Sequence, residues 1–182
     1  EVGIFGEDGE KVPTGQVGEI YFHKMEGPPP PVLYIGAEIR RIGDWFSYGD
    51  MGWLDELGFL YMADRRVDMI VTGAVNVFPA EVESALSEHP GIADVVVVGL
   101  RDPEWGRRVH AIVQAEDPSH PPDVDEVIGF AKERLAAYKC PKTVDVMDEL
   151  PRNPTGKILK KDLRKQYWRS AERRAGTECR SR

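Results

Sequence analysis

The segment RNPTGKIL at residues 152–159 presents a lysine at the end of a short turn. Pro154 and Gly156 are typical turn residues, and an apolar pattern of helical spacing begins after Lys157. An ammonium presented in this way can bind an anionic group such as a phosphate or a carboxylate. The same pattern is also typical of a solvated charge near the start of a helix, and spacing alone does not separate the two interpretations.

Asp50 and Arg65 are further residues that could bind a polar ligand. Asp50 follows Gly49 in a turn, where a carboxylate accepts hydrogen bonds either from two adjacent hydroxyls of a ligand or from its own backbone. The guanidinium of Arg65 has several directed donors and suits hydroxyl recognition better than an ammonium does. A salt bridge from Arg65 to Asp64 or Asp68 is the alternative.

Several other catalytic and metal-binding patterns are disfavoured. The tetrapeptide PTGK lacks the preceding G-x-x-x-x-G of a P-loop, and Ile158 stands where that loop has Ser or Thr. Cys140 and Cys179 form no CxxC pair, so we expect neither a zinc site nor a disulfide framework, and we predict a reducing, cytoplasmic setting. The histidines share no ligand spacing, so no metal site is expected. They are His23, His89, His110 and His120.

The composition is typical of a globular protein, with 41% hydrophobic and 30% charged residues in a chain of 182. No apolar run approaches the roughly 18 residues that span a membrane. The chain begins without Met or a signal peptide, which suggests a piece of a longer protein. The basic end at 157–182 is short and has few aromatic residues. We therefore expect a solvated helix with a disordered tail at 169–182, and no nucleic-acid site.

Short strand patterns alternate with turns over residues 1–63. Residues 17–22 predict a strand, and residues 52–54 and 58–62 predict a hairpin around the turn DELG. The prolines at 26–31 break regular structure and indicate an exposed polyproline stretch. This part is rich in β patterns but lacks the long apolar strands of an independent domain.

Helix patterns recur over residues 69–168. Pro79 suits the first turn of a helix whose apolar positions continue to His89. Asp123 suits the N-cap of a second helix, and apolar spacing predicts a third helix at 159–167.

Strand patterns lie between these helices. The run of valines within 93–100 predicts a strand buried on both faces, whereas alternation over 109–115 predicts a half-buried strand. A further short strand is predicted at 143–147. Alternating helices and strands over about 100 residues indicate a compact α/β domain.

Three segments, taken in order, resemble motifs of the adenylate-forming superfamily, which contains acyl-CoA synthetases, luciferases and peptide-synthetase adenylation domains. The segments are WFSYGDMGWLDELGFL, DRRVDMIVTGAVNVFPAEVE and LPRNPTGKILKKDLR. They are similar to W-F-x-T-G-D-x-G-x-x-D-x-x-G-x-L, D-R-x-K/D-D-x-I-x-x-G-G-x-N-I-x-P-x-E-I-E and L-P-x-x-x-x-G-K-x-x-x-x-x-L. Each motif alone is weak, but the three at this spacing extend over residues 15–168 and make the resemblance specific.

The resemblance implies that the chain is the last part of a longer enzyme. Residues 1–63 correspond to the β-rich end of a large N-terminal domain, 64–68 to a hinge, 69–168 to a mobile small C-terminal domain, and 169–182 to a tail. The expected fold class is α/β (or α+β), with a short mixed sheet flanked by helices in the small domain. The phosphate loop and acid pocket of the family lie in the large domain, so we expect this chain to be inactive alone.

The resemblance also implies a reaction. In this family, ATP and a carboxylic acid form an acyl adenylate with release of pyrophosphate, the small domain swings, and a thiol, usually that of CoA, displaces AMP. Lys157 would stabilise the charge that develops during adenylate formation, and Asp50 and Arg65 would bind the ribose of ATP. Mg²⁺ would accompany ATP and be bound mainly by the large domain. The hinge would fall at Val67 and Asp68.

Further residues are implied on the thiol side of the reaction. The small-residue loop at Gly73 and Ala74 would lie against the pantetheine arm of CoA, with Trp105 beside the same tunnel. Stacking on adenine and pairing with the CoA phosphates are assigned to Tyr138, Lys139 and Lys142. A helix end with long solvated side chains is the alternative for this last group.

Three positions depart from the family pattern. Tyr48 stands for the Thr of T-G-D, Ala74 for the second Gly of the G-G pair, and Val67 for the charged hinge residue. The methyl group of Ala74 could narrow the thiol channel, and Val67 leaves the exact pivot open. The lysine and both ribose-binding residues are retained, so adenylation is the better supported half-reaction.

Two alternatives to an acid–CoA ligase remain open. One is an adenylating enzyme that uses a carrier-protein thiol or another acceptor, and the other is a non-catalytic module that retains the fold. No carrier-type attachment sequence follows Trp168, which favours free CoA. The acid itself is not predicted, because the residues that line its pocket would lie in the other domain.

Overall fold

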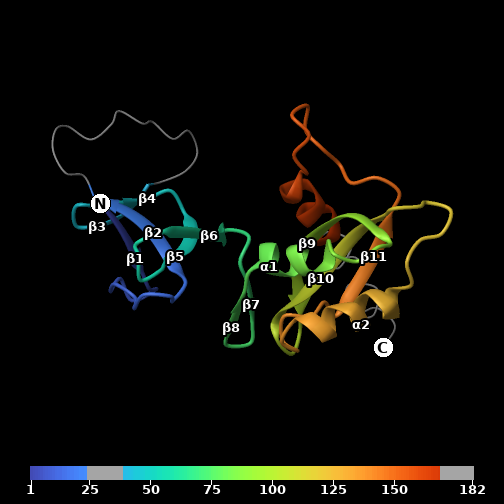
Figure 1. The fold of residues 1–182 in the computed structure, drawn as a ribbon, viewed down its shortest axis with the longest axis horizontal. Helices are drawn as coiled ribbons and strands as arrows, with labels where there is room; N and C mark the ends of the chain where they lie inside the picture. The colour runs from blue at the N-terminus through green and yellow to red at the C-terminus, as the bar shows by residue number, and fades with distance from the viewer. Residues whose placement is uncertain (24–38, 169–182) are drawn as a thin grey trace, which may run out of the picture. The chain divides into compact units, whose positions relative to one another are not determined.

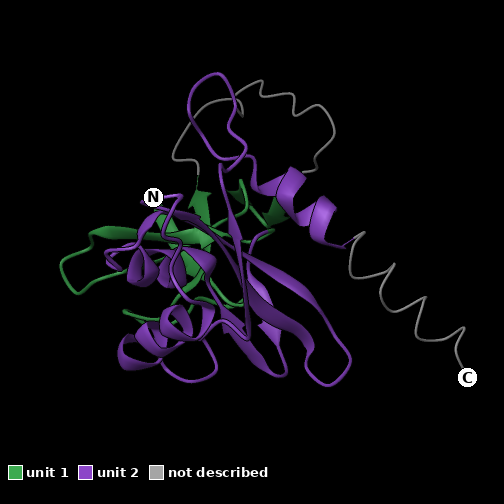
Figure 2. Ribbon diagram, turned by 90° about the vertical axis from the view of Figure 1, so that its right-hand side faces the viewer, with its two compact units in different colours: residues 1–67 green, residues 68–182 purple. Residues whose placement is uncertain are grey.

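The computed structural model describes residues 1–23 and 39–168, and the chain divides into two compact units (Figure 2). Unit 1 is Glu1–Val67 and unit 2 is Asp68–Arg182. The polyproline prediction at 26–31 and the predicted tail at 169–182 lie outside the described residues. Within the described ranges, no helix is long and apolar enough to cross a membrane.

Unit 1 contains an antiparallel sheet in which the described strands follow the order β3-β4-β2-β5-β6, with β1 paired to β2 (Figure 1). The strands are β1 (Val2–Phe5), β2 (Gly18–His23), β3 (Arg40–Ile42), β4 (Trp45–Ser47), β5 (Asp50–Leu54) and β6 (Leu60–Arg65). The strand predicted at 17–22 is confirmed as β2, whose Ile20 and Tyr21 are buried. The Phe5 ring packs against Tyr21 and Trp45, with centroids 5.0 and 5.2 Å apart.

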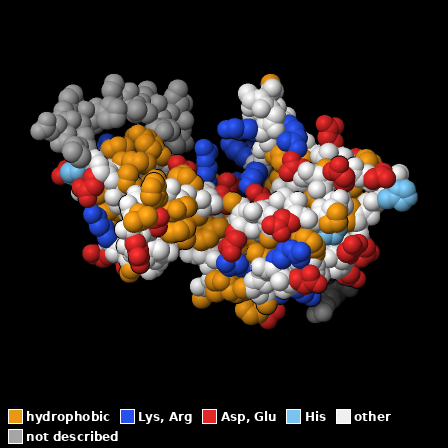
Figure 3. Space-filling view, viewed as in Figure 1, with side chains coloured by type: hydrophobic (Ala, Val, Ile, Leu, Met, Phe, Trp, Pro, Cys, Tyr) orange, Lys and Arg blue, Asp and Glu red, His pale blue; other side chains and the backbone are white. Residues whose placement is uncertain are grey.

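The hairpin predicted around DELG is confirmed by the pairing of β5 with β6. The Asp55 carboxylate accepts the backbone N–H groups of Leu57 and Phe59 at 2.9 and 2.8 Å, which closes the turn. In the described part of unit 1, β6 is the last strand of the order, and its first residues are exposed and apolar. They are Leu60, Tyr61 and Met62. Hydrophobic side chains gather on the face of unit 1 that Figure 3 shows.

Unit 2 contains a sheet of order β11-β10-β9, in which β9 and β10 are antiparallel and β10 and β11 are parallel. The predicted mixed sheet is therefore confirmed. The elements of unit 2 are β7 (Ile70–Thr72), β8 (Val75–Val77), α1 (Pro79–Leu86), β9 (Ile92–Asp102), β10 (Gly106–Ala115), α2 (Val124–Arg134) and β11 (Thr143–Met147). β7 and β8 form a separate hairpin, and residues 160–168 form the last described helix.

Helices cover both faces of the sheet of unit 2. One face packs against α1 and α2 through apolar side chains that include Val82 and Val127. The opposite face packs against the helix 160–168, whose Leu163 is fully buried together with Ile112 of β10. The sheet is thus the middle layer of unit 2.

β10 is buried on both faces and is not half-buried, so that prediction was wrong. His110 and Ile112 lie on the face that the alternating pattern assigned to solvent, yet they are 2% and 0% exposed. The cause is the helix 160–168, which covers this second face from far along the chain. Alternation within one strand carries no information about a covering element so distant in sequence.

Both predicted helix starts are confirmed. Pro79 occupies the first turn of α1, and the Asp123 carboxylate accepts the N–H groups of the second and third residues of α2 at 2.8 and 3.3 Å. α1 ends at Leu86, before the predicted His89. His89 instead forms a tight turn, in which its Nδ1 accepts the Gly91 N–H at 3.0 Å.

His110 lies in a buried polar environment on β10. Its Nδ1 is 2.8 Å from the Thr143 hydroxyl, and its Nε2 is 3.9 Å from a carboxylate oxygen of Asp145. The ring of Tyr167, from the last described helix, lies 4.8 Å away between centroids. Burial lowers the pKa of His110, and the positive charge of Arg108 acts in the same direction, whereas Asp145 and a hydrogen bond with the Thr143 backbone oppose the shift.

We predict that unit 2 loses stability as the pH falls below about 6.5, because His110 is neutral when folded and takes up a proton on unfolding. A folded-state pKa below the unfolded value adds stability above the unfolded pKa, and this stability is lost as the pH falls through the folded pKa. Urea unfolding between about pH 8 and pH 5, followed by the NMR amide signals of β10, measures the dependence.

His110→Gln should flatten this pH dependence, because the titrating ring is gone. Equal slopes for the wild type and His110→Gln would contradict the interpretation.

Candidate functional site

Asp50 and Arg65 are direct cross-strand partners in the β5–β6 pairing. The Arg65 Nε is 3.8 Å from Asp50 Oδ1, and the two side chains are 75% and 35% exposed. An ion pair this open to solvent holds its partners weakly, so both groups remain available to a ligand. The two residues that the resemblance assigns to ribose therefore lie together on unit 1.

The turn that carries Asp50 is fixed by its neighbours. The Ser47 hydroxyl accepts the Gly49 N–H at 3.0 Å, and the Gly49 carbonyl accepts the Arg66 N–H at 2.9 Å. Gly49 has a φ of 83°, a conformation that a residue with a Cβ adopts only with strain. The glycine of the YGD segment is thus required by the backbone that positions the carboxylate.

Glu19 is a buried carboxylate that the sequence reasoning missed. Its side chain is 3% exposed, and its Oε2 accepts from Arg40 Nη1 at 2.6 Å and from Arg66 Nη1 at 3.0 Å. A buried charge needs partners, so these contacts fasten Arg66 within unit 1. The available signal was a charged residue inside the apolar pattern of β2.

Val67 separates two residues that are each fastened within their own unit. Arg66 is held in unit 1 by Glu19, as above. Asp68 is held in unit 2 by Arg164, whose Nη2 donates to Asp68 Oδ1 at 2.8 Å. The Val67 residue itself is 70% exposed.

Lys157 lies in a loop that projects from unit 2 between β11 and the last described helix (orange in Figure 1). We call residues 150–159 the lysine loop. Asn153, which the sequence reasoning missed, organises this loop. Its Oδ1 accepts the N–H and hydroxyl of Thr155 at 3.0 and 2.8 Å and the N–H of Lys157 at 2.9 Å. Gly156 has a φ of 83°, which explains the glycine of the motif.

The Lys157 side chain is exposed, and among the described residues its ammonium has no hydrogen-bond or ion-pair partner. Lys160, by contrast, donates to Glu83 Oε2 at 2.7 Å and is partly buried. Lys and Arg side chains gather around the lysine loop in Figure 3. The loop therefore presents a cation that has no partner among the described residues, an arrangement that can attract an anionic ligand.

Gly73 and Trp105 lie together although they are distant in sequence. The Gly73 N–H donates to the Trp105 carbonyl at 2.8 Å, and a Cβ on Gly73 would sit 3.2 Å from the Trp105 ring. Ala74 follows in the same turn between β7 and β8. Trp105 is 50% exposed, so its ring can contact a ligand beside this turn.

Tyr138, Lys139 and Lys142 lie in the connection between α2 and β11. Lys139 Nζ is 2.6 Å from Glu81 Oε1, and this hydrogen bond raises the pKa of Lys139. The Lys142 N–H donates to the Val109 carbonyl at 2.9 Å, while the Lys142 side chain is exposed, as is Tyr138. Lys139 therefore has a structural partner that a phosphate would have to share. For Lys142, the hydrogen bond found within residues 1–23 and 39–168 is that of its backbone N–H.

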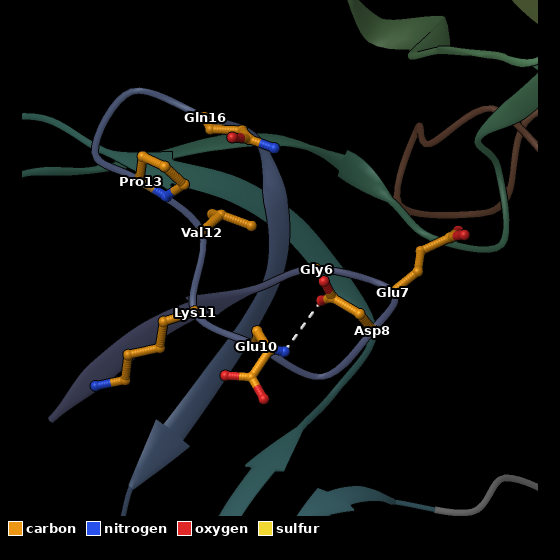
Figure 4. Close-up of a pocket in the computed structure, with 8 residues that line it drawn as sticks. All are labelled: Gly6, Glu7, Asp8, Glu10, Lys11, Val12, Pro13 and Gln16. Carbon is orange, nitrogen blue, oxygen red and sulfur yellow. Dashed lines mark hydrogen bonds between the residues drawn. The ribbon is translucent and has the colours of Figure 1, made fainter.

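A shallow pocket on unit 1 involves none of the predicted site residues (Figure 4). It lies at the connection between β1 and β2, where Asp8 Oδ1 accepts the Glu10 N–H at 3.1 Å. The pocket is lined by Gly6, Glu7, Asp8, Glu10, Lys11, Val12, Pro13 and Gln16. In residues 1–23 and 39–168, no group of three or more His, Cys, Asp or Glu side chains is placed to hold a metal ion.

Comparison with known proteins identifies related chains. Residues 81–157 match the family of AMP-binding enzyme C-terminal domains. The chain is 37% identical over 175 residues to the fatty acid–[acyl-carrier-protein] ligase ScoC of Streptomyces coeruleorubidus. This match covers 94% of this chain and 33% of that protein. It is 40% identical over 172 residues to the feruloyl-CoA synthase of an Amycolatopsis species, and this match covers 92% of this chain and 34% of that protein.

Solved structures give the same result. The o-succinylbenzoate CoA synthetase MenE from Bacillus subtilis, in complex with the acyl-adenylate intermediate OSB-AMP, has a TM-score of 0.74 and 38% sequence identity. The match covers 90% of this chain and 33% of that chain. These relatives are ligases, synthases and synthetases by name, and the resemblance to the adenylate-forming superfamily that the motifs predict is confirmed. The chain spans about a third of the length of the curated relatives it matches.

We predict that Gly73→Ala destabilises unit 2 by about 1–2 kcal/mol, because Gly73 has a φ of 60° and this left-handed backbone costs an L-residue about that much. The new Cβ would also press on the Trp105 ring at 3.2 Å. Urea unfolding measures the loss, and the indole NMR signal of Trp105 should shift.

Gly129→Ala is the matched control, because Gly129 lies in α2 with open space around its Cβ position. This change should be neutral or stabilising, since alanine favours a helix over glycine. A Gly73→Ala variant as stable as the wild type, with an unshifted Trp105 signal, would show that the contact does not constrain the turn.

Proposed function

We propose that the chain acts as the C-terminal part of an ATP-dependent carboxylic acid–CoA ligase. The observation that carries the proposal is Lys157, whose exposed ammonium has no partner among the described residues while Asn153 fixes its backbone. The family match over 81–157 and the named activities of the relatives support this class of reaction.

In the first half-reaction, a carboxylate oxygen of the acid attacks the α-phosphorus of ATP, and the bond to the departing pyrophosphate breaks. Negative charge develops between the carboxylate and the α-phosphate. The Lys157 ammonium stabilises this charge, and one such group typically contributes about 3–4 kcal/mol to the transition state, or about 10²–10³ in rate. Asp50 accepts hydrogen bonds from the ribose hydroxyls, and Arg65 donates to them.

In the second half-reaction, the thiol of CoA loses its proton, its sulfur bonds to the acyl carbon, and AMP leaves. The turn at Gly73 and Ala74 lies against the pantetheine arm, with Trp105 beside it. The nucleotide end of CoA contacts Tyr138, Lys139 and Lys142. Val67 and Asp68 form the pivot between the two half-reactions, a role supported by the separate anchoring of Arg66 and Asp68.

The remainder of the enzyme supplies what this chain does not. In this proposal it provides the acid pocket and the phosphate-binding loop, and it binds most of the Mg²⁺ that enters with ATP. The chain alone therefore has no turnover. The cytoplasmic location stays a prediction.

A carrier-protein thiol is the second candidate acceptor. The observation that favours it is the name of the relative ScoC, a fatty acid–[acyl-carrier-protein] ligase. Free CoA and a carrier domain share the same phosphopantetheine arm, so the turn at Gly73 suits both. Assays with each acceptor distinguish them.

We predict that Lys157→Ala in the complete ligase lowers the rate of adenylate formation by about 10²–10³, because the cation that stabilises the transition state is lost. Pyrophosphate release measures this half-reaction. Thioester formation from pre-formed acyl adenylate should change by less than about twofold, since that step does not need this charge. Lys161→Ala is the matched control, because Lys161 is an exposed lysine on the same segment. Equal damage to both half-reactions would contradict the proposed role.

We predict that Lys142→Ala raises the KM for CoA several-fold and leaves the KM for ATP unchanged, because its exposed ammonium pairs with a CoA phosphate. Steady-state kinetics with CoA and with pantetheine, which lacks those phosphates, measure the effect. The KM for pantetheine should not respond. Lys132→Ala on α2 removes another exposed lysine and should have no effect on either KM. An unchanged KM for CoA in Lys142→Ala would remove this residue from the thiol site.

A further inference from the structure

Arg152 connects the lysine loop to the sheet of unit 2. Its guanidinium forms an ion pair through Nη2 with Asp94 Oδ2 of β9, and its Nη1 donates to the Gly156 carbonyl at 2.9 Å. A second contact lies beside the first, because Gln114, the β10 partner of Asp94, accepts the Leu150 N–H at 3.1 Å. The first arm of the loop is therefore tied to the sheet at two neighbouring points.

The contact with Gly156 controls the peptide that leads into Lys157. The Gly156 carbonyl and the Lys157 N–H belong to one planar peptide unit. Arg152 donates to the carbonyl of this unit, and Asn153 Oδ1 accepts its N–H at 2.9 Å. The following carbonyl, that of Lys157, accepts the Asn153 N–H at 2.8 Å. The backbone of Lys157 is thus held on both sides of its Cα, which sets the direction of its side chain.

We propose that Arg152, held by Asp94, is a positioning residue for Lys157 in adenylate formation, an inference that rests on the proposed function. The role requires a guanidinium, because a planar fork donates in two fixed directions at once, whereas a lysine ammonium is a single flexible point charge. The guanidinium joins a strand of the sheet to the peptide before the reacting lysine.

A role for Arg152 as one more cation that attracts ATP makes a different prediction. Loss of attraction would raise the KM for ATP and leave kcat unchanged, because binding of ground state and transition state weakens equally. Loss of positioning lowers kcat instead, and a misplacement of about 1 Å costs about 10²-fold.

The kinetic experiment uses the complete ligase with Arg152→Lys and Asp94→Asn. We expect Arg152→Lys to lower the kcat of adenylate formation by about 10–100-fold, with the KM for ATP and the thioester half-reaction each within about twofold. Asp94→Asn should act in the same direction. The double variant should be no slower than Arg152→Lys alone, because both changes break one connection. Arg134→Lys is the matched control, since Arg134 pairs with Glu88 and Glu133 on the surface of unit 2.

A second experiment needs no catalysis and uses the 182-residue chain itself. Amide hydrogen exchange at Lys157 should be at least about tenfold faster in Arg152→Lys and unchanged in Arg134→Lys, because the N–H loses its fixed acceptor geometry. If the Lys157 amide of Arg152→Lys exchanges at the wild-type rate, the inference is overturned, whatever the kinetic experiment gives.

The remaining outcomes also decide the question. A raised KM for ATP with normal kcat would show attraction and overturn positioning, and equal loss in both half-reactions would show a general folding defect and overturn it too. Normal adenylation by Lys157→Ala would instead refute the proposed function, and the exchange result would still report whether Arg152 orders the loop.

Discussion

The pairing of β9 with β10 is the constraint on which unit 2 depends. Both strands bury side chains on both faces, so the sheet is stable only when helices close over each side. The helix 160–168 closes one of these sides, and it follows the lysine loop directly. Leu150 and Leu163 are both fully buried in that layer. The core that completes the fold therefore also fixes the chain before and after the exposed lysine.

Features set by neighbouring residues could be predicted from the sequence. The cap at Asp123 and the DELG hairpin depend on hydrogen bonds that reach only a few residues along the chain. Pro79 suits a first helical turn through its own fixed φ and missing N–H. The burial of β10 could not be predicted in the same way. It depends on a helix whose position is set by packing and not by local pattern.

The same distinction between local and distant contacts applies to the candidate site. Asp50, Arg65 and Lys157 could be identified from the sequence because each lies in a short motif. The residues that hold their backbone in place lie in other parts of the chain. Glu19 binds Arg66, whose N–H donates to the turn that carries Asp50. Asp94, on a strand of the sheet, binds Arg152 of the lysine loop. These contacts join distant residues, and no spacing rule encodes them. The resemblance assigned both Gly73 and Trp105 to the thiol side of the reaction, but the hydrogen bond between them is seen only in the fold.

β6 is the last strand of the sheet order in the described part of unit 1, and its edge bears on how the protein behaves in solution. A strand at the end of a sheet offers unpaired N–H and C=O groups to any other strand, and apolar side chains make such an edge prone to aggregation. Asp64 and Arg65 place charge only on the last residues of β6, while Leu60 to Met62 carry none. Colloidal behaviour at high concentration thus depends on whether another polypeptide covers the first half of this strand.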